Sequence, residues 1–432
     1  MSQDGASKSY SLSAYGRLLA ANRDFRLLWS AQVVSEIGDW LYSVAIYSLL
    51  LDLTGSARSV GFAVVLQLLP QVFVAPTAGV INDRVNRRAV MIFADLARVF
   101  IVGSMLFVRS VEMVWLIWVL LFLETIMWAL FEPGRSALLP AICHSDDELL
   151  VANALSSTTW AVNLTIGSGI GGLVAVLFGR NAVFGLNATS FVVSAYILSL
   201  MRVKETHTDQ LPPMRFRDLL DFKPIWEGIQ YVRRDVKMVA TLLVKAGMGL
   251  LGAHWVILPV LGERVFPIHS DGLDPSRGGA LAMSLLLGSR GIGALVGSFA
   301  SGYIGRNESP RMRRGIFWGF ILVAVSYMLL SGAPTLWLAC LAVMAGHAGT
   351  STAWVFSTTM LQQSTEDRFR GRVFSADFGG LFLVMSIVSF LAGVLVDTGS
   401  PIREIAFWTG VLGFVPAFAW LAAQRFWKCR ET

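Results

Sequence analysis

Twelve apolar runs, each about as long as a membrane span, most constrain the fold of this 432-residue chain. A helix needs about 20 mainly apolar residues to cross a bilayer. Backbone polar groups in lipid must find partners within the protein, so runs of this length fold as helices. They cover residues 27–51, 60–81, 89–108, 114–131, 158–178, 182–201, 238–261, 279–304, 315–333, 336–361, 373–397 and 405–424. The sequence therefore predicts an all-α polytopic membrane protein with twelve transmembrane helices.

Composition and motifs exclude several classes of protein. Only 15% of the residues are charged and the mean hydropathy is +0.61, whereas a soluble protein carries about 25% charged residues. Cys143, Cys340 and Cys429 lie too far apart in sequence for a metal or disulfide pattern. The chain has neither the phosphate loop of ATPases nor a His-Glu-x-x-His motif. We expect no cofactor, no metal and no enzymatic activity.

The distribution of lysine and arginine predicts the orientation. With a cytoplasmic N-terminus, 26 of the 35 basic residues fall in cytoplasmic segments, six in external loops and three inside spans. An excess of basic residues marks the cytoplasmic side of a membrane protein. We therefore expect a multi-pass protein of the inner or plasma membrane with both termini in the cytoplasm. Because the basic residues gather on one membrane side, no nucleic-acid partner is expected.

Residues 202–237 form the longest loop and predict the boundary between an N-terminal unit (1–201) and a C-terminal unit (238–432). Apolar residues recur at helical spacing after a Pro-Pro pair; they are Leu219, Phe222, Ile225, Trp226, Ile229 and Val232. This pattern predicts an amphipathic helix on the cytoplasmic leaflet. Docking of a regulatory partner there is the alternative.

The loop from Gly79 to Arg88 joins the second and third runs. Its three arginines and Asp83 cannot sit in hydrocarbon. Gly79 allows close approach of a helix, and Asp83 can meet a helix N-terminus. The loop resembles the G-x-L-x-D-R-x-G-R-R loop of the major facilitator superfamily. The resemblance implies two six-helix bundles and a cytoplasmic latch between them that uses Asp83, Arg84, Arg87 and Arg88. The alternative is that these charges only fix the orientation of the chain in the membrane.

Two further segments resemble one branch of that superfamily. Residues 131–140 read Phe-Glu-Pro-Gly-Arg-Ser-Ala-Leu-Leu-Pro, and residues 359–373 resemble the corresponding segment of the second unit. Gly38-Asp39-Trp40 in the first span also fits. The branch is that of drug:proton antiporters and includes exporters of macrolides and of catecholate siderophores. The resemblance covers essentially the whole chain and does not specify a substrate.

Small residues on two spans predict close helix contacts. The segment 167–172, with Gly167, Gly171 and Gly172, resembles the antiporter signature G-P-x-x-G-G with serine in place of proline. Gly293 and Gly297 form a small-xxx-small pair on the eighth span. In the family these two helices pack across the bundles, which implies a sliding surface. Ordinary helix packing explains each stretch equally well.

Charged residues inside spans are the candidate site, because each is costly unless it is paired or faces water. Glu36 and Asp39 share one helix face, and Glu124 lies at a similar depth in the fourth span. We expect the three acids to form a proton-binding cluster near the midplane, since repulsion and desolvation favour protonation. Asp39 and Glu124 are the preferred proton carriers, with Glu36 a substrate contact.

Positive charges in the second unit complete the candidate set. Lys245 and Arg290 could neutralise the acids in one conformation or receive an anionic substrate; a static pair within that unit is the alternative. Asp95 and Arg98 predict an internal pair that supports the nearby loop. Asp377 is expected to join Arg370 and Arg372 in the cytoplasmic network, which adds Arg372 to the latch.

Aromatic residues and the resemblance complete the functional hypothesis. Several tryptophans could line a pocket for flat amphiphiles, although most are expected to face lipid; they are Trp40, Trp128, Trp160, Trp255 and Trp354. We expect a proton-coupled exporter of an amphiphilic small molecule that works as a monomer, with a small-molecule substrate, protons and membrane lipid as its partners. A lipid or lysolipid transporter, and a sensor that has lost transport, are the alternatives.

Overall fold

The computed structural model describes residues 12–203, 223–233, 235–269, 274–305 and 309–431, and these form helices joined by short turns with no strand among them. The helices are α2 (Leu12–Ala21), α3 (Arg23–Thr54), α4 (Ala57–Arg84), α5 (Arg87–Ser104), η1 (Met105–Phe107), η2 (Val111–Met113), α6 (Val114–Ile142), α7 (Asp146–Phe178), α8 (Arg180–Ser199), α9 (Lys223–Val232), α10 (Val236–Gly249), α11 (His254–Val260), η4 (Leu261–Val265), α12 (Pro275–Gly305), α13 (Ser309–Ser331), α14 (Leu336–Ser364), α15 (Asp367–Asp397) and α16 (Ile402–Glu431).

Eleven stretches of the described chain are long and apolar enough to cross a membrane. They match the predicted spans from the second to the twelfth, and the first predicted span is the exception. Its helix, α3, is 32 residues long, but Glu36, Asp39 and other polar side chains lower its hydropathy. The chain is therefore an all-helical, multi-pass membrane protein.

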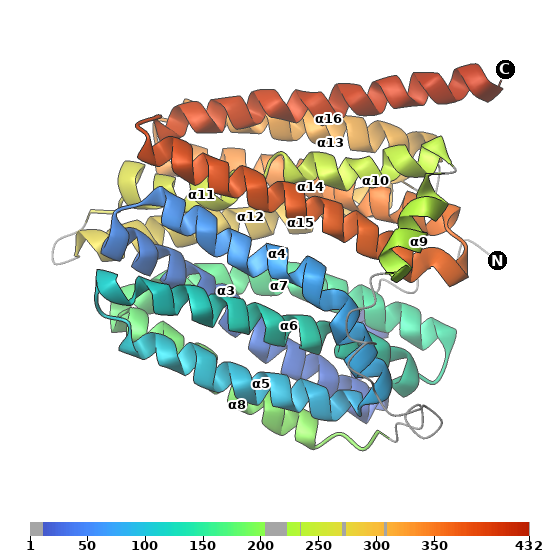
Figure 1. Cartoon of the computed structure of the whole chain (residues 1–432), viewed down its shortest axis with the longest axis horizontal. Helices are drawn as coiled ribbons and strands as arrows, with labels where there is room; N and C mark the ends of the chain where they lie inside the picture. The colour runs from blue at the N-terminus through green and yellow to red at the C-terminus, as the bar shows by residue number, and fades with distance from the viewer. Residues whose placement is uncertain (1–11, 204–222, 234, 270–273, 306–308, 432) are drawn as a thin grey trace.

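The helices pack in two groups, which meet mainly along two pairs of helices (Figure 1). In the N-terminal group, α3 packs on α7 and α8, α4 packs on α6, and α5 packs on α6 and α8. In the C-terminal group, α14 packs on α12 and α13, α13 on α16, and α10 on α15. The most extensive contacts between the groups are those of α4 with α15 and α7 with α12; α3 also contacts α11 and α12, and α4 contacts α11.

Tight turns define the two ends of the helix stack. The turns at Gly55, Gly179 and Gly399 all use positive φ, which glycine adopts without a steric penalty. They lie at one end of the stack, here called the Gly55 end (left in Figure 1). The turn before α5 lies at the opposite end, here called the Asn86 end. There the Asn86 side chain accepts a hydrogen bond from the Ala89 amide at 2.8 Å and caps α5.

The seventh predicted span is a broken helix. Leu250, Leu251 and Gly252 donate their amides to carbonyls three residues back, so the regular α-helical hydrogen bonding stops between α10 and α11. A Cβ on Gly252 would lie 2.8 Å from the Met385 carbonyl oxygen of α15, so only glycine fits this approach. The freed Gly252 carbonyl accepts a hydrogen bond from Ser389 at 2.8 Å.

The glycine stretches have different partners from those predicted. Gly167 and Gly171 pack on Ile37, Trp40 and Leu41 of α3, within their own group, and only Gly172 faces α12. Gly293 and Gly297 pack on the Met344 and Ala348 carbonyls of α14 and do not face α7.

The contact between α7 and α12 uses other small residues. Cβ atoms on Gly172 and Gly291 would overlap Ser284 and Thr165 across the two helices. The expected sliding surface is therefore wrong for Gly167, Gly171, Gly293 and Gly297, because helix rotation turns their faces inward to their own groups.

Replacement of Gly252 by alanine tests the broken helix. We expect Gly252→Ala to lower stability by about 1–3 kcal/mol, the usual cost of overpacking, because the new methyl would meet the Met385 carbonyl. The measurement is thermal unfolding of the purified protein in detergent. Gly169→Ala is the control, since a Cβ there has open space around it. Equal melting of both variants would contradict the packing described.

Candidate functional site

Arg98 of α5 is the centre of a buried ion network in the N-terminal group. Its guanidinium donates to Asp95 Oδ1 at 2.8 Å and lies 3.5 Å from Asp39 Oδ2. Asp95 also accepts a hydrogen bond from Ser194 at 2.6 Å, and the Arg98 guanidinium lies 4.2 Å from the centre of the Phe191 ring. The expected Asp95–Arg98 pair forms, and its contacts join α5 to α3 and α8.

Arg98 lies within ion-pair distance of two carboxylates and acts electrostatically on a third. Glu124 of α6 interacts electrostatically with both Arg98 and Asp39. Asp39 Oδ1 is buried and has no hydrogen-bond partner within the described residues. A buried charged oxygen without a partner is unfavourable by several kcal/mol. The geometry therefore leaves Asp39 able to take a proton or a cationic group.

Glu36 lies one turn before Asp39 on α3 and has a different environment. Its two oxygens accept hydrogen bonds from Gln32 and from Asn163 of α7, both at 2.8 Å. Neutral amides thus hold Glu36, whereas Arg98 holds Asp39. Glu36 and Glu124 both act electrostatically on Asp39, so the three acids lie in one region. Their roles in proton and substrate binding stay predictions.

Lys245 does not face the acids of the other group. Its ammonium lies 2.5 Å from Asp377 Oδ2, and both side chains are 1% exposed. The rings of Trp354 and Phe378 lie 4.5 and 4.4 Å from the Lys245 nitrogen. The alternative of a static pair within the C-terminal unit is therefore the one observed in this conformation. The expected place of Asp377 beside Arg372 is wrong, because α15 turns Asp377 toward α10.

Arg290 of α12 lies where the two groups meet. Its guanidinium is 4.1 Å from the Trp255 ring centre and 5.9 Å from that of Trp40. The two indoles, from α11 and α3, stack with their centres 6.5 Å apart and 6° between their planes. Arg290 Nη1 is buried without a hydrogen-bond partner in the described part of the chain. A cation and two stacked indoles thus bridge the groups.

More polar and aromatic side chains surround this cation–aromatic cluster of Arg290, Trp40 and Trp255. Tyr47 packs on Trp255 with ring centres 6.3 Å apart and donates its hydroxyl hydrogen to Gln67 at 2.7 Å. Trp255 lies in the first turn of α11, directly after the break in this span. Sequence reasoning named both tryptophans but missed Tyr47 and Gln67, because their polar groups occur singly in apolar runs.

Two of the predicted latch residues, Arg87 and Arg88, donate hydrogen bonds to backbone carbonyls at the Asn86 end. Arg87 donates to the Asn82 and Ala137 carbonyls at 3.2 and 3.1 Å, and Arg88 donates to the Leu198 carbonyl at 2.9 Å. These carbonyls all belong to the N-terminal group. The bonds tie the turn before α5 to α6 and α8, as expected of a charged turn that stabilises one end of a helix group.

Gly79 and Arg372 were also part of the predicted latch, which stays a prediction. A Cβ on Gly79 would have no atom of the described residues within 4 Å, so no described helix packs closely on it. Arg372 pairs with Glu227 of α9 at 2.6 Å, while Tyr231 of α9 stacks on Phe369 at 4.2 Å. The linker helix therefore packs on α15. Leu219 and Phe222, and the side chains of Asp83 and Arg370, lie outside the described residues.

A set of hydrogen bonds made by Asp397, here called the Asp397 clasp, joins the two groups at the Gly55 end. Sequence reasoning missed it. Asp397, the last residue of α15, accepts from the Ala57 and Arg58 amides at 2.8 and 3.2 Å and from the Ser56 hydroxyl. A carboxylate at a helix N-terminus is stabilised by the free amides and the helix dipole. Arg264 adds a bond to the Gly55 carbonyl at 2.7 Å. The only sequence sign was an acid at the end of an apolar run.

Comparison with known proteins identifies the family. The model of the transmembrane secretion effector family of the major facilitator superfamily matches residues 18–411. The chain belongs to this family. Macrolide efflux protein A of Streptococcus pyogenes is 25% identical over 86% of this chain and 89% of its own. The putative bacilysin exporter BacE of Bacillus subtilis is 22% identical over 77% and 78%.

Solved transporters share the fold of this family member. A POT family transporter in complex with 5-aminolevulinic acid superposes with a TM-score of 0.72 at 12% identity, covering 93% of this chain and 96% of its own. The nucleoside transporter NupG superposes with a TM-score of 0.67 at 11% identity, covering 93% and 99%. These likenesses show the fold, whereas the family and the efflux relatives make the chain a transporter and not an enzyme.

The Lys245–Asp377 pair can be tested by double substitution. Lys245→Met leaves Asp377 buried and unpaired, so we expect it to lower stability by about 3–5 kcal/mol. Adding Asp377→Leu removes the stranded charge and is expected to recover most of that loss. Thermal unfolding of both single variants and the double variant measures the coupling. Additive losses would contradict the buried pair.

Proposed function

We propose that this family member is a proton-coupled exporter of an amphiphilic small molecule. The observation that supports proton coupling is the excess of acid around Arg98. Asp39, Asp95 and Glu124 interact with this single cation, and one arginine neutralises only one of them. Uncompensated acids inside a membrane are expensive, so one or more protons complete the charge balance.

The substrate site in this proposal lies between the acids and the cation–aromatic cluster. The stacked indoles offer flat apolar surfaces, which suit a ring-bearing amphiphile. Both groups of helices contribute to it, so a bound substrate contacts both and responds to their relative movement. The names of the relatives mention a macrolide and bacilysin; we extend from them only the direction of transport, export.

The proposed mechanism is alternating access by two six-helix bundles. In this mechanism α3 also crosses the membrane and, with the eleven apolar spans, brings their number to twelve. Positive charge is enriched at the Asn86 end, which we take as cytoplasmic together with both termini. The Asp397 clasp then closes the external side. Protons that enter from outside neutralise the acids and weaken substrate binding. They thereby favour return to the inward-facing state, in which the external side is closed, because a ligand shifts a conformational equilibrium through its differential affinity.

Efflux measurements test the proton-coupled export. In cells that lack other pumps, expression of the protein should lower accumulation of one or more compounds from an amphiphile panel, and an uncoupler should abolish the effect. Asp39→Asn and Glu124→Gln are each expected to reduce export to the level of cells without the protein. Glu112→Gln, which changes an exposed acid at the Gly55 end, is the matched control and should export normally.

Several outcomes would contradict this function. Export that ignores the uncoupler would overturn proton coupling, and normal export by both acid variants would overturn the site. Exchange of labelled lysolipid in vesicles without any gradient would favour a lipid transporter. No flux under any gradient, in a protein that folds and reaches the membrane, would favour a sensor.

The Asp397 clasp provides a separate test of alternating access. Asp397→Ala removes three hydrogen bonds to a charged group, each worth about 1.5–3 kcal/mol, so the ratio of clasped to unclasped protein should fall at least about tenfold. Distances between spin labels at Val111→Cys and Leu395→Cys, in a chain without its native cysteines, report the Gly55 end. Thr398→Ala is the control, because that hydroxyl bonds only to the Leu395 carbonyl of its own helix. Unchanged distances in Asp397→Ala would show that the clasp does not hold this state.

A further inference from the structure

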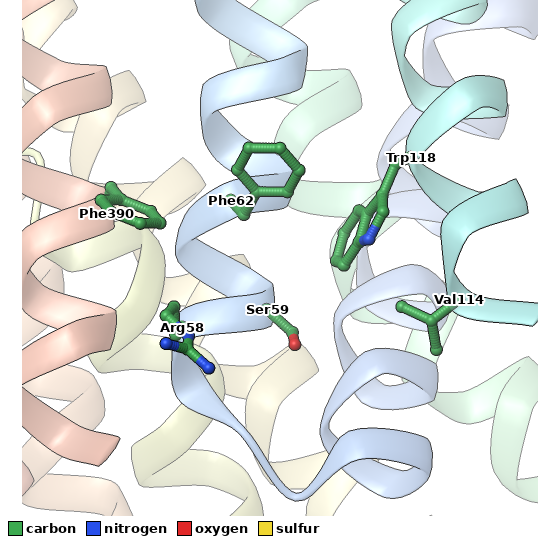
Figure 2. Close-up of a pocket in the computed structure, with 6 residues that line it drawn as sticks. All are labelled: Arg58, Ser59, Phe62, Val114, Trp118 and Phe390. Carbon is green, nitrogen blue, oxygen red and sulfur yellow. The ribbon is translucent and has the colours of Figure 1, made fainter. Parts of the chain in front are cut away.

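A groove beside the clasp has no role in the proposed transport path. It has a volume of about 430 Å³ and is lined by Arg58, Ser59, Phe62, Val114, Trp118 and Phe390 (Figure 2). The first three belong to α4, the next two to α6, and Phe390 to α15. The groove therefore has walls from both groups of helices. It lies beside the line of contact between α4 and α15, here called the seam.

The lining is divided into a polar end and an apolar end. Figure 2 shows the Arg58 guanidinium and the Ser59 hydroxyl at one end, with the rings of Phe62, Trp118 and Phe390 toward the other. Arg58 is exposed, and none of the ion pairs among the described residues includes it. Phe62 packs edge-to-face on Trp118 at 5.1 Å between ring centres. The groove therefore has a positive charge and a hydroxyl at one end and aromatic rings at the other.

The depth of the groove matches the edge of a lipid leaflet. Arg58 lies in the first turn of α4, while Phe62 and Trp118 lie about 6 Å deeper, one turn along their helices. Phe390 lies seven residues, or about 10 Å, before the end of α15. The helices that flank the groove expose apolar side chains, with Trp115 62% and Leu395 48% exposed. A basic residue above aromatic rings is the usual pattern at a membrane interface.

We propose that this groove binds an anionic phospholipid, with its phosphate on Arg58 and Ser59 and its acyl chain along Phe62, Trp118 and Phe390. Arginine binds phosphate through paired, charge-assisted hydrogen bonds. The lipid reaches the groove from the surrounding leaflet, because the groove opens beside lipid-exposed apolar side chains. The proposal is independent of the substrate and of proton coupling.

The bound lipid stabilises the clasped state. Gly61 of α4 packs directly on the Ser389 carbonyl and Phe390 backbone of α15, and Arg58 donates its amide to Asp397. Separation of α4 from α15 would remove Phe390 from the groove. A lipid that contacts both walls has higher affinity for the clasped state and shifts the equilibrium toward it.

The test uses the full chain in nanodiscs of phosphatidylcholine with or without phosphatidylglycerol. Native mass spectrometry measures retained phosphatidylglycerol, and the spin labels at Val111→Cys and Leu395→Cys measure the clasped population. We expect Arg58→Gln to retain phosphatidylglycerol about fivefold more weakly, the effect of one basic residue at an anionic surface. Phosphatidylglycerol should raise the clasped population of the wild type and leave that of Arg58→Gln unchanged.

Two variants and two soluble ligands make the test specific. Arg109→Gln removes an exposed arginine near the same end but outside the groove, and should behave as wild type. Phe390→Ala should keep phosphatidylglycerol on Arg58 but lose its effect on the clasp. Equal retention by Arg58→Gln and Arg109→Gln would overturn the site. The same would follow if glycerol phosphate alone shifted the clasp, or if an exported compound displaced the lipid.

Discussion

The cost of placing charge inside a membrane governs the interior of this protein. Each ionisable side chain within the helix groups must be paired, hydrogen-bonded or protonated, because lipid offers no water to solvate it. Lys245 and Asp377 neutralise one another, and aromatic rings lie around the Lys245 ammonium. Arg98 has more acid around it than it can neutralise. The first arrangement is balanced in charge, one cation with one carboxylate, although Asp377 Oδ1 has no hydrogen-bond partner among the described residues. The second has capacity for an additional positive charge.

Helix packing separates what is rigid from what can move. Gly167 and Gly171 bring α7 against α3, and Gly293 and Gly297 bring α12 against α14. These contacts are internal to each group and allow helix backbones to approach closely. The groups meet mainly along α4 with α15 and α7 with α12. Movement of the groups as units would therefore keep the glycine contacts and rearrange the seam, its clasp and the cation–aromatic cluster.

The sequence was sufficient where the physical signal is local. Apolar runs of span length, counted along the chain, predicted all eleven of the apolar spans that the described residues form. The charged residues stranded inside these runs were recognisable as exceptional, because each breaks a strong local pattern. The resemblance at Gly79–Arg88 and over residues 131–140 also anticipated the family that the comparison established.

Pairing, in contrast, was decided by tertiary structure. Lys245 and Asp377 are 132 residues apart, and no periodicity relates them. A rotation of one helix by one residue, about 100°, decides whether Gly293 faces α7 or α14 and whether Asp377 faces Lys245 or Arg372. The sequence alone determined that this chain crosses a membrane as helices with charges trapped among them, since hydropathy acts residue by residue. Only the packed fold decided which charge meets which, because that depends on how separate helices turn toward one another.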